Sequence, residues 1–135
     1  VPRVPEAAFP GVLRLADAVI DPPHFTGGYT SLIAFGQGVP VVTLPGAFMR
    51  SRLTYAFYRQ MGLSEMVAVD AEAYVTLAVK LANDRDFYRE ISDRIRERAK
   101  VLFDDMTAVR ELEQFFIQAV EGQRRAEGIS ELLNR

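Results

Sequence analysis

The chain has 135 residues, of which 49% are hydrophobic and 25% are charged, a composition typical of one globular domain with its own core. Its formal net charge of −2 gives no electrostatic reason to expect nucleic acid or an anionic membrane as a partner. With no cysteine and one histidine, the sequence offers neither a disulfide framework nor a histidine-based metal cluster, and no apolar run approaches the ~20 residues of a membrane span. We therefore expect a cytoplasmic protein with no metal cofactor.

The first residues predict an irregular start. The chain begins with valine in an extended, proline-containing stretch, and we expect it to be a piece of a longer protein. Pro10 and Gly11 interrupt a mostly apolar segment, so a broken or late-starting helix is expected at 10–16. The apolar run 18–20 predicts a first strand that is buried rather than at an exposed edge, and it ends at Asp21.

A loop rich in proline and glycine follows, and it leads into a helix. Residues 30–36 predict that helix, with its N-cap at Thr26 or within 29–31. A second buried strand is expected at 41–44, because prolines stand on both sides of this apolar run. The order of strand, loop, helix and strand is that of a βαβ unit.

The next helix and strand complete the expected sheet. A helix is predicted at 51–61, ended by Gly62, and its apolar face is formed by Leu53, Ala56, Phe57 and Met61. A third short strand is predicted at 66–69. By the right-handed crossover rule, these strands form a parallel sheet. The predicted fold class is therefore α/β, a partial Rossmann-like fold of three layers with a short parallel sheet. Its uncovered apolar edge raises the hypothesis of a homo-oligomer.

Helices alone follow the third strand. Asp70 is a good N-cap for a helix at 71–82, whose apolar stripe consists of Tyr74, Leu77, Ala78 and Leu81. A long amphipathic helix is expected at 86–103, and the alternating charges on its polar face indicate ion pairs in water rather than a nucleic-acid site.

A last helix is predicted at about 107–120, capped by Asp104 or Asp105. Its expected inward residues are Val109, Leu112, Phe116 and Val120. We divide the chain into a domain at 1–120 and a polar helical tail at 121–135. In that tail, Ile129, Leu132 and Leu133 indicate a short terminal helix.

The loop at 26–31, which follows the first predicted strand and opens the helix predicted at 30–36, is the main candidate for a binding site. It lies beyond the carboxyl end of a strand, where open parallel sheets bind ligands. Gly27 and Gly28 let the backbone approach a phosphate closely, Thr30 and Ser31 offer hydroxyl donors, and the N–H groups of the helix start suit an anion. A plain strand-to-helix turn explains the same residues, so the pattern alone leaves both interpretations open.

Two further side chains are weaker candidates. His24 can donate to a phosphate or a sugar hydroxyl, but a loop histidine packed on Phe25 is favoured, and no carboxylate partner makes it a general base. Arg52, with Arg50, follows the second strand on the same side of the sheet, where a guanidinium pairs well with a diphosphate. A solvated helix start is the alternative there. No catalytic residue is predicted in this chain.

The order of these motifs resembles a known family. The matching parts are Asp21-Pro22, Gly27-Gly28-x-Thr30-Ser31, the run from Gly38 to Gly46, Arg52 and Met61-Gly62-Leu63. They resemble the C-terminal, nucleotide-binding half of O-GlcNAc-transferase-like glycosyltransferases, the TPR-linked, SPINDLY-type enzymes. The similarity covers about residues 1–120. Its most specific part is Gly-Val-Pro-Val-Val-Thr-Leu-Pro-Gly at its fixed distance from the two glycines.

The resemblance implies a GT-B fold in which this half holds UDP-GlcNAc or a related nucleotide sugar. It implies transfer of the sugar to serine or threonine of a protein acceptor, and an upstream TPR region and N-terminal GT-B half in the parent protein. In such enzymes the loop matching Gly27, Gly28, Tyr29 and Thr30 holds the diphosphate, so Tyr29 joins the predicted site as a residue that packs on the ligand. We expect the chain alone to be inactive.

Two alternatives remain. The family usually places Asp or Glu where this chain has Ile33, and this difference favours a non-catalytic GT-B domain used for protein interaction or assembly. A free-standing flavodoxin-like binding domain is weaker, because that fold needs five strands and the sequence predicts three.

Overall fold

The computed structural model describes residues 4–133, with side chains described as far as residue 123. The chain divides into two compact units, the first ending at Phe103 and the second beginning at Asp104. The first contains η1 (Glu6–Ala8), α1 (Phe9–Leu13), β1 (Val19–Ile20), α2 (Gly28–Gly36), β2 (Val41–Val42), η2 (Met49–Ser51), α3 (Leu53–Met61), α4 (Ala71–Asn83), α5 (Arg85–Arg98) and η3 (Ala99–Leu102). The second is built on α6 (Met106–Leu133). Within residues 4–133, no helix is both long enough and apolar enough to cross a membrane.

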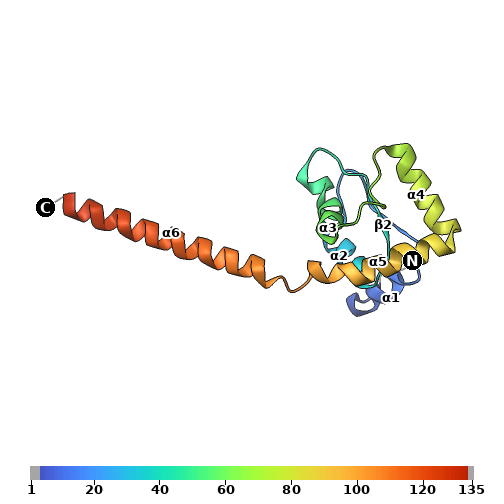
Figure 1. The fold of residues 1–135 in the computed structure, drawn as a ribbon, viewed down its shortest axis with the longest axis horizontal. Coiled ribbons are helices and arrows are strands. Elements are labelled where there is room, and N and C mark those ends of the chain that lie inside the picture. The colour runs from blue at the N-terminus through green and yellow to red at the C-terminus, as the bar shows by residue number, and fades with distance from the viewer. Residues whose placement is uncertain (1–3, 134–135) are drawn as a thin grey trace. The chain divides into compact units, whose positions relative to one another are not determined.

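The two strands form the parallel pair that the sequence predicts. Val19 lies opposite Val41 and Ile20 opposite Val42, and α2 makes the crossover between them. Helices pack on both sides of β2: α2 and α4 contact it, and Figure 1 shows β2 between α3 and α4. The predicted class, a partial Rossmann-like α/β fold of three layers, is confirmed.

The predicted third strand at 66–69 is wrong. In the described chain this segment contributes one parallel bridge, between Thr43 and Val67. The Val67 N–H turns back to the carbonyl oxygen of Ser64 at 3.0 Å, and α4 begins shortly afterwards. The backbone therefore leaves the ladder after a single paired residue.

β1 is also less buried than the sequence predicts. Ile20 is 50% exposed, whereas Val41 and Val42 of β2 are fully buried. In the described sheet β1 has a partner on one side alone, so its outer edge faces solvent. The expectation of an uncovered apolar edge is met at β1.

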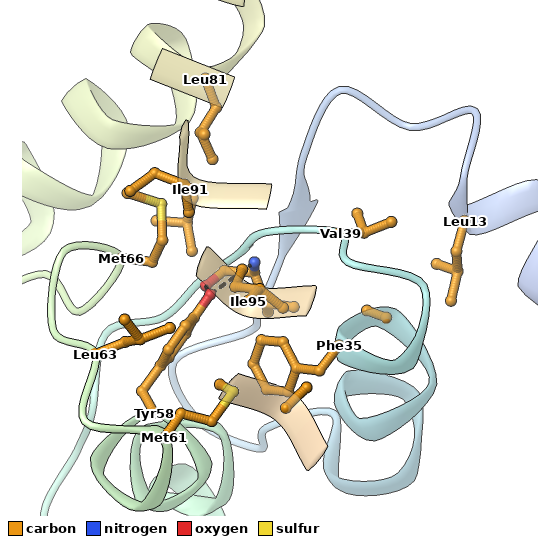
Figure 2. Packing of buried hydrophobic residues seen from close by; sticks show 14 residues of the cluster. Leu13, Phe35, Val39, Tyr58, Met61, Leu63, Met66, Leu81, Ile91 and Ile95 are labelled. Atoms are coloured by element: carbon orange, nitrogen blue, oxygen red, sulfur yellow. Dashed lines mark hydrogen bonds between the residues drawn. The ribbon is translucent and has the colours of Figure 1, made fainter. Parts of the chain in front are cut away.

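The core of the first unit joins α2, α3 and α5 to the sheet. Figure 2 shows the rings of Tyr58 and Phe35 at its centre; their centroids are 4.8 Å apart and their planes are inclined by 68°. Ile91 and Ile95 of α5 are buried in the same cluster. The buried positions of α5 are spaced as the amphipathic pattern predicts.

The inward face of α3 agrees with the predicted one in part, because Met61 is buried and Phe57 packs against the core. Thr54, Tyr58 and Met61 are its buried residues, whereas Ala56 is exposed and Leu53 is half-buried. Thr54 and Tyr58 are tolerated inside because both hydroxyls find hydrogen-bond partners on other elements. A pattern of apolar residues alone misses such a face.

Helix boundaries follow the predicted signals closely. The Asp70 carboxylate accepts from the Ala73 N–H at 2.8 Å, which confirms the predicted cap of α4. The Asp84 carboxylate accepts from the Phe87 N–H at 2.9 Å and caps α5, a cap that the sequence prediction does not include. Gly62 ends α3 in the left-handed conformation, with φ of 67°. Exposed ion pairs within α5, such as Arg96 with Asp93, agree with the predicted solvated face.

The second unit differs from the prediction. Asp105 accepts from the Thr107 N–H at 2.9 Å, which confirms the cap, but α6 continues to Leu133 without a break near residue 121. The side chains of Ile129, Leu132 and Leu133 lie outside the described residues. The expected inward residues Val109, Leu112, Phe116 and Val120 are 44–57% exposed, because the described part of this unit, residues 104–133, contains no second helix or strand against which α6 can bury its apolar face. The predicted boundary at residue 120 stays a prediction.

Candidate functional site

An open hollow of about 450 Å³ lies at the start of α2, beyond the carboxyl end of β1. It is lined by Pro22, Phe25, Thr26, Gly27, Gly28, Tyr29, Thr30 and Leu53. Four of the seven predicted site residues, 27–30, are therefore brought together in one place. Hollows of similar size occur beside α4, so the position at a strand end and a helix start singles this one out, rather than its volume.

Asp21 organises the loop behind the hollow. Its side chain is 1% exposed, and its Oδ1 accepts from the backbone N–H of Gly27 at 2.7 Å. Its Oδ2 accepts from the Thr43 hydroxyl at 2.7 Å, and its backbone carbonyl oxygen accepts from the Tyr74 hydroxyl at 2.8 Å. One residue thus ties the end of β1 to α2, to the residue after β2 and to α4.

Thr26 joins this loop to the next one along the chain. Its N–H and hydroxyl donate to the carbonyl oxygen of Arg50 at 2.9 and 3.2 Å, and its hydroxyl oxygen accepts from the Leu53 N–H at 3.3 Å. The prediction that Thr26 or a residue within 29–31 caps α2 is therefore wrong, because the capping position is Gly27 and Thr26 serves the start of α3.

The N–H groups of the first helical turn are the groups that an anion would use. The leading N–H groups of any helix lack partners within the helix. That of Gly27 is taken by Asp21, and that of Ser31 donates to the Gly27 carbonyl oxygen at 3.1 Å. Gly28, Tyr29 and Thr30, the residues between Gly27 and Ser31, line the hollow. Gly28 has a φ of 26°, a backbone conformation that side chains with a Cβ rarely adopt.

The hydroxyls of Thr30 and Ser31 have different surroundings. Thr30 is exposed, and its hydroxyl donates to the Gly27 carbonyl oxygen at 2.5 Å. Ser31 is 1% exposed, and its hydroxyl pairs with that of Thr54 at 2.8 Å. A ligand reaches the Ser31 hydroxyl only after that pair opens, whereas the Thr30 side chain is accessible.

Of the remaining predicted residues, His24 and Arg52 lie outside the lining and Tyr29 lies within it. His24 is exposed. The Arg52 guanidinium donates to the Gly46 carbonyl oxygen at 2.8 Å and lies over the Tyr55 ring, 4.8 Å from its centroid. Tyr29 is 68% exposed and lines the hollow, so its ring is free to pack on a ligand. The binding roles of all seven predicted residues stay predictions.

Burial shifts the pKa of one tyrosine in this network. Removal of the Tyr74 hydroxyl from water raises its pKa above the ordinary value, and the negative charge of Asp21 raises the pKa further. Tyr74 therefore keeps its proton and remains the donor in the bond to Asp21 throughout the neutral range.

Sequence reasoning missed three residues of this network: Asp21, Thr43 and Tyr74. The sequence assigns Asp21 to the end of a strand and Thr43 to a strand, both within the family motifs, and Tyr74 to an apolar stripe, but it predicts none of the hydrogen bonds between them. The available signal was an acid and a threonine at the carboxyl ends of two predicted neighbouring strands, because such ends meet at one edge of a parallel sheet.

A parallel βαβ unit whose glycine-containing loop leaves the first strand and opens a helix defines a Rossmann-like α/β domain. Residues 11–112 match the model of glycosyl transferase family 41, and the chain belongs to this family. The predicted resemblance to O-GlcNAc-transferase-like glycosyltransferases is thereby confirmed.

Individual relatives agree with this assignment. A UDP-N-acetylglucosamine–peptide N-acetylglucosaminyltransferase of Caenorhabditis elegans is 30% identical over 93 residues, which make up 67% of this chain and 8% of that protein. The SEC protein of Arabidopsis thaliana, named as a probable enzyme of the same kind, is 30% identical over 107 residues, or 77% of this chain and 11% of that protein. A solved variant of the Thermobaculum terrenum O-GlcNAc transferase superimposes with a TM-score of 0.74 at 31% identity, covering 84% of this chain and 22% of that one. The chain therefore spans a small part of the length of these relatives.

Proposed function

We propose that this chain forms the diphosphate-binding part of the donor site in a protein O-GlcNAc transferase, and that its donor is UDP-GlcNAc or a related nucleotide sugar. The observation that carries the proposal is the hollow at the start of α2, which lies within the stretch that matches the family. The names of the relatives support the choice of donor and of a peptide acceptor.

The geometry suggests how the loop assists sugar transfer. The bond between the sugar and the diphosphate breaks while a serine or threonine oxygen of the acceptor bonds to the sugar carbon, and negative charge grows on the departing UDP. N–H groups at the start of α2, together with the helix dipole, stabilise that charge. Gly27, Gly28, Tyr29 and Thr30 are the proposed contacts, with Ser31, His24 and Arg52 as further candidates. The acceptor hydroxyl loses its proton to a group that we do not assign within this chain.

Several features of the intact protein belong to the same proposal. We place the chain after a TPR region and an N-terminal GT-B half, in the cytoplasm, with UDP-sugar binding that requires no metal. A homo-oligomer formed through the edge of β1 is part of the proposal, supported by the 50% exposure of Ile20.

The test is calorimetry of the protein at its full natural length with UDP and UDP-GlcNAc. Gly28→Asp is expected to abolish binding, because it places a carboxylate and a strained backbone beside the proposed diphosphate. Gly11→Asp is the matched control, since an added Cβ there meets no atom within 4 Å. Unchanged binding by Gly28→Asp contradicts the proposed site. Residues 1–135 alone are expected to show neither UDP-sugar hydrolysis nor transfer, and measurable turnover contradicts that expectation.

One observation favours a second function, a non-catalytic domain for protein interaction or assembly. Ile33, one turn into α2, is half-buried and packs against the core, and it offers no hydrogen-bond acceptor to a ribose. Absence of binding at ~1 mM UDP, which corresponds to a binding free energy weaker than about −4 kcal/mol, supports this second function.

A further inference from the structure

We infer that Asp21 is the positioning residue of the proposed donor site, and that it acts by fixing Gly27 through a hydrogen bond. This inference rests on the proposed function. Asp21 is fully buried behind the loop, outside the lining of the hollow, so it does not touch a ligand there. Its effect on binding passes through the backbone that it holds.

The first step of the argument is the placement of the carboxylate. Asp21 is held in the sheet by its own N–H, which donates to the Val42 carbonyl oxygen at 3.0 Å, and by the Tyr74 hydroxyl on its carbonyl oxygen. The Thr43 hydroxyl orients the side chain by donating to Oδ2 at 2.7 Å. Oδ1 is thereby presented to Gly27 in one defined position.

The second step is the effect on the helix start. Gly27 is the residue before α2, and its N–H is directed to Asp21 at 2.7 Å. Glycine has the greatest backbone freedom of any residue, and Gly28 follows it directly, so this turn would be loose without an anchor. The bond to Asp21 orders both glycines and so sets the direction of the N–H groups that follow them.

The third step separates the hydrogen bond from the charge. A carboxylate behind the helix start repels an incoming diphosphate, so the charge of Asp21 works against binding while its hydrogen bond supports it. An asparagine keeps an oxygen acceptor for Gly27, and its amide N–H can donate to the Thr43 hydroxyl oxygen. Asp21→Asn therefore removes the unfavourable part and retains the favourable one.

The experiment measures the dissociation constant of UDP by calorimetry for variants of the full-length protein. Asp21→Ala is expected to weaken binding by about tenfold, the loss of one hydrogen bond to a charged group. Asp21→Asn is expected to bind at least as tightly as the wild type. Thr43→Val, which retains the bond to Gly27 but loosens the carboxylate, is expected to weaken binding by about threefold.

A stability control excludes a general effect of weakened folding. Ser92→Ala removes another buried hydrogen bond of the first unit, from the Ser92 hydroxyl to the Gly38 carbonyl oxygen at 2.6 Å. It is expected to lower the melting temperature while leaving UDP affinity unchanged. If Asp21→Ala does not fold, the UDP affinities of Asp21→Asn and Thr43→Val still decide whether Asp21 positions the loop through its hydrogen bond to Gly27.

The outcomes are distinguishable. Wild-type affinity in Asp21→Ala, or binding as weak in Asp21→Asn as in Asp21→Ala, overturns the role of Asp21 while leaving the site in place. A wild-type protein that does not bind UDP overturns the proposed function itself, and the inference with it.

Discussion

The hydroxyl of Tyr58 bonds to both backbone groups of Val41: it donates to the carbonyl oxygen at 2.9 Å and accepts from the N–H at 3.0 Å. In a parallel ladder, alternate residues of a strand bond to opposite sides. The N–H groups of Val19 and Asp21 donate to the carbonyl oxygens of Pro40 and Val42. The backbone groups of Val41 therefore face the side on which a third strand would pair. The Tyr58 hydroxyl occupies that position, and pairing with the Met66–Ala68 segment begins only at Thr43. A side chain thus replaces one peptide unit of the sheet.

Tyr58→Phe is expected to lower the free energy of unfolding of the chain by about 2–6 kcal/mol. The change leaves a buried N–H and a buried carbonyl oxygen without partners, and each such group costs ~1–3 kcal/mol. Chemical denaturation measures the effect. Tyr55→Phe is the matched control on α3, because Tyr55 is half-buried and its ring lies under the Arg52 guanidinium. Equal losses in the two variants contradict the assigned role of the Tyr58 hydroxyl.

Stability is expected to fall as the pH rises above ~10, the pKa of an unperturbed tyrosine. Burial raises the pKa of Tyr58 far above this value, and burial with the nearby Asp21 charge raises the pKa of Tyr74. The folded state therefore holds both protons at a pH where the unfolded state releases them, so their contribution is fully present below ~10 and is lost above it.

Unfolding measured between pH 8 and 11 tests this dependence. Each tyrosine contributes a slope of up to ~1.4 kcal/mol per pH unit. Replacing Tyr74 with phenylalanine removes its share of the slope. A free energy of unfolding that stays flat to pH 11 shows that the two phenols ionise equally in both states.

Ile95→Ala is expected to destabilise the chain by about 2–5 kcal/mol, since the side chain is fully buried and its removal leaves a cavity in the core. Val79→Ala on α4 serves as its counterpart, because Val79 is 55% exposed and its truncation is expected to change stability by less than ~0.5 kcal/mol. Comparable losses at the two positions are the outcome that contradicts the described core. Figure 2 shows Ile95 within that core, in the same cluster as Tyr58.

Ile20→Lys is expected to abolish any self-association that proceeds through the outer edge of β1, because edge lysines oppose strand pairing. Ile20 is half exposed, so the same change is expected to cost little stability. Sedimentation over a range of concentrations measures the association. Leu15→Lys controls for the added charge, since Leu15 is 85% exposed and lies outside the strand. If the variant at position 20 associates as the wild type does, the edge is not the interface.

The sequence by itself was sufficient for features that depend on near neighbours. The carboxylate cap at Asp70 and the glycine end of α3 involve groups within a few residues of one another. The parallel βαβ order and the family also follow from linear patterns, the latter from the glycine loop and the apolar run after it. Local propensity and spacing carry this information.

Only the tertiary structure decided which polar side chains go inside and what they bind. Tyr58 reaches Val41, Ser31 meets Thr54, and Asp21 receives bonds from Gly27, Thr43 and Tyr74. Most of these partners are far apart in the sequence, and a buried polar group is stable only when such a partner is present. Hydrophobic spacing therefore misses Thr54 and Tyr58 on the inward face of α3 and predicts an extra strand, because it does not show which distant hydroxyl or carboxylate satisfies the backbone.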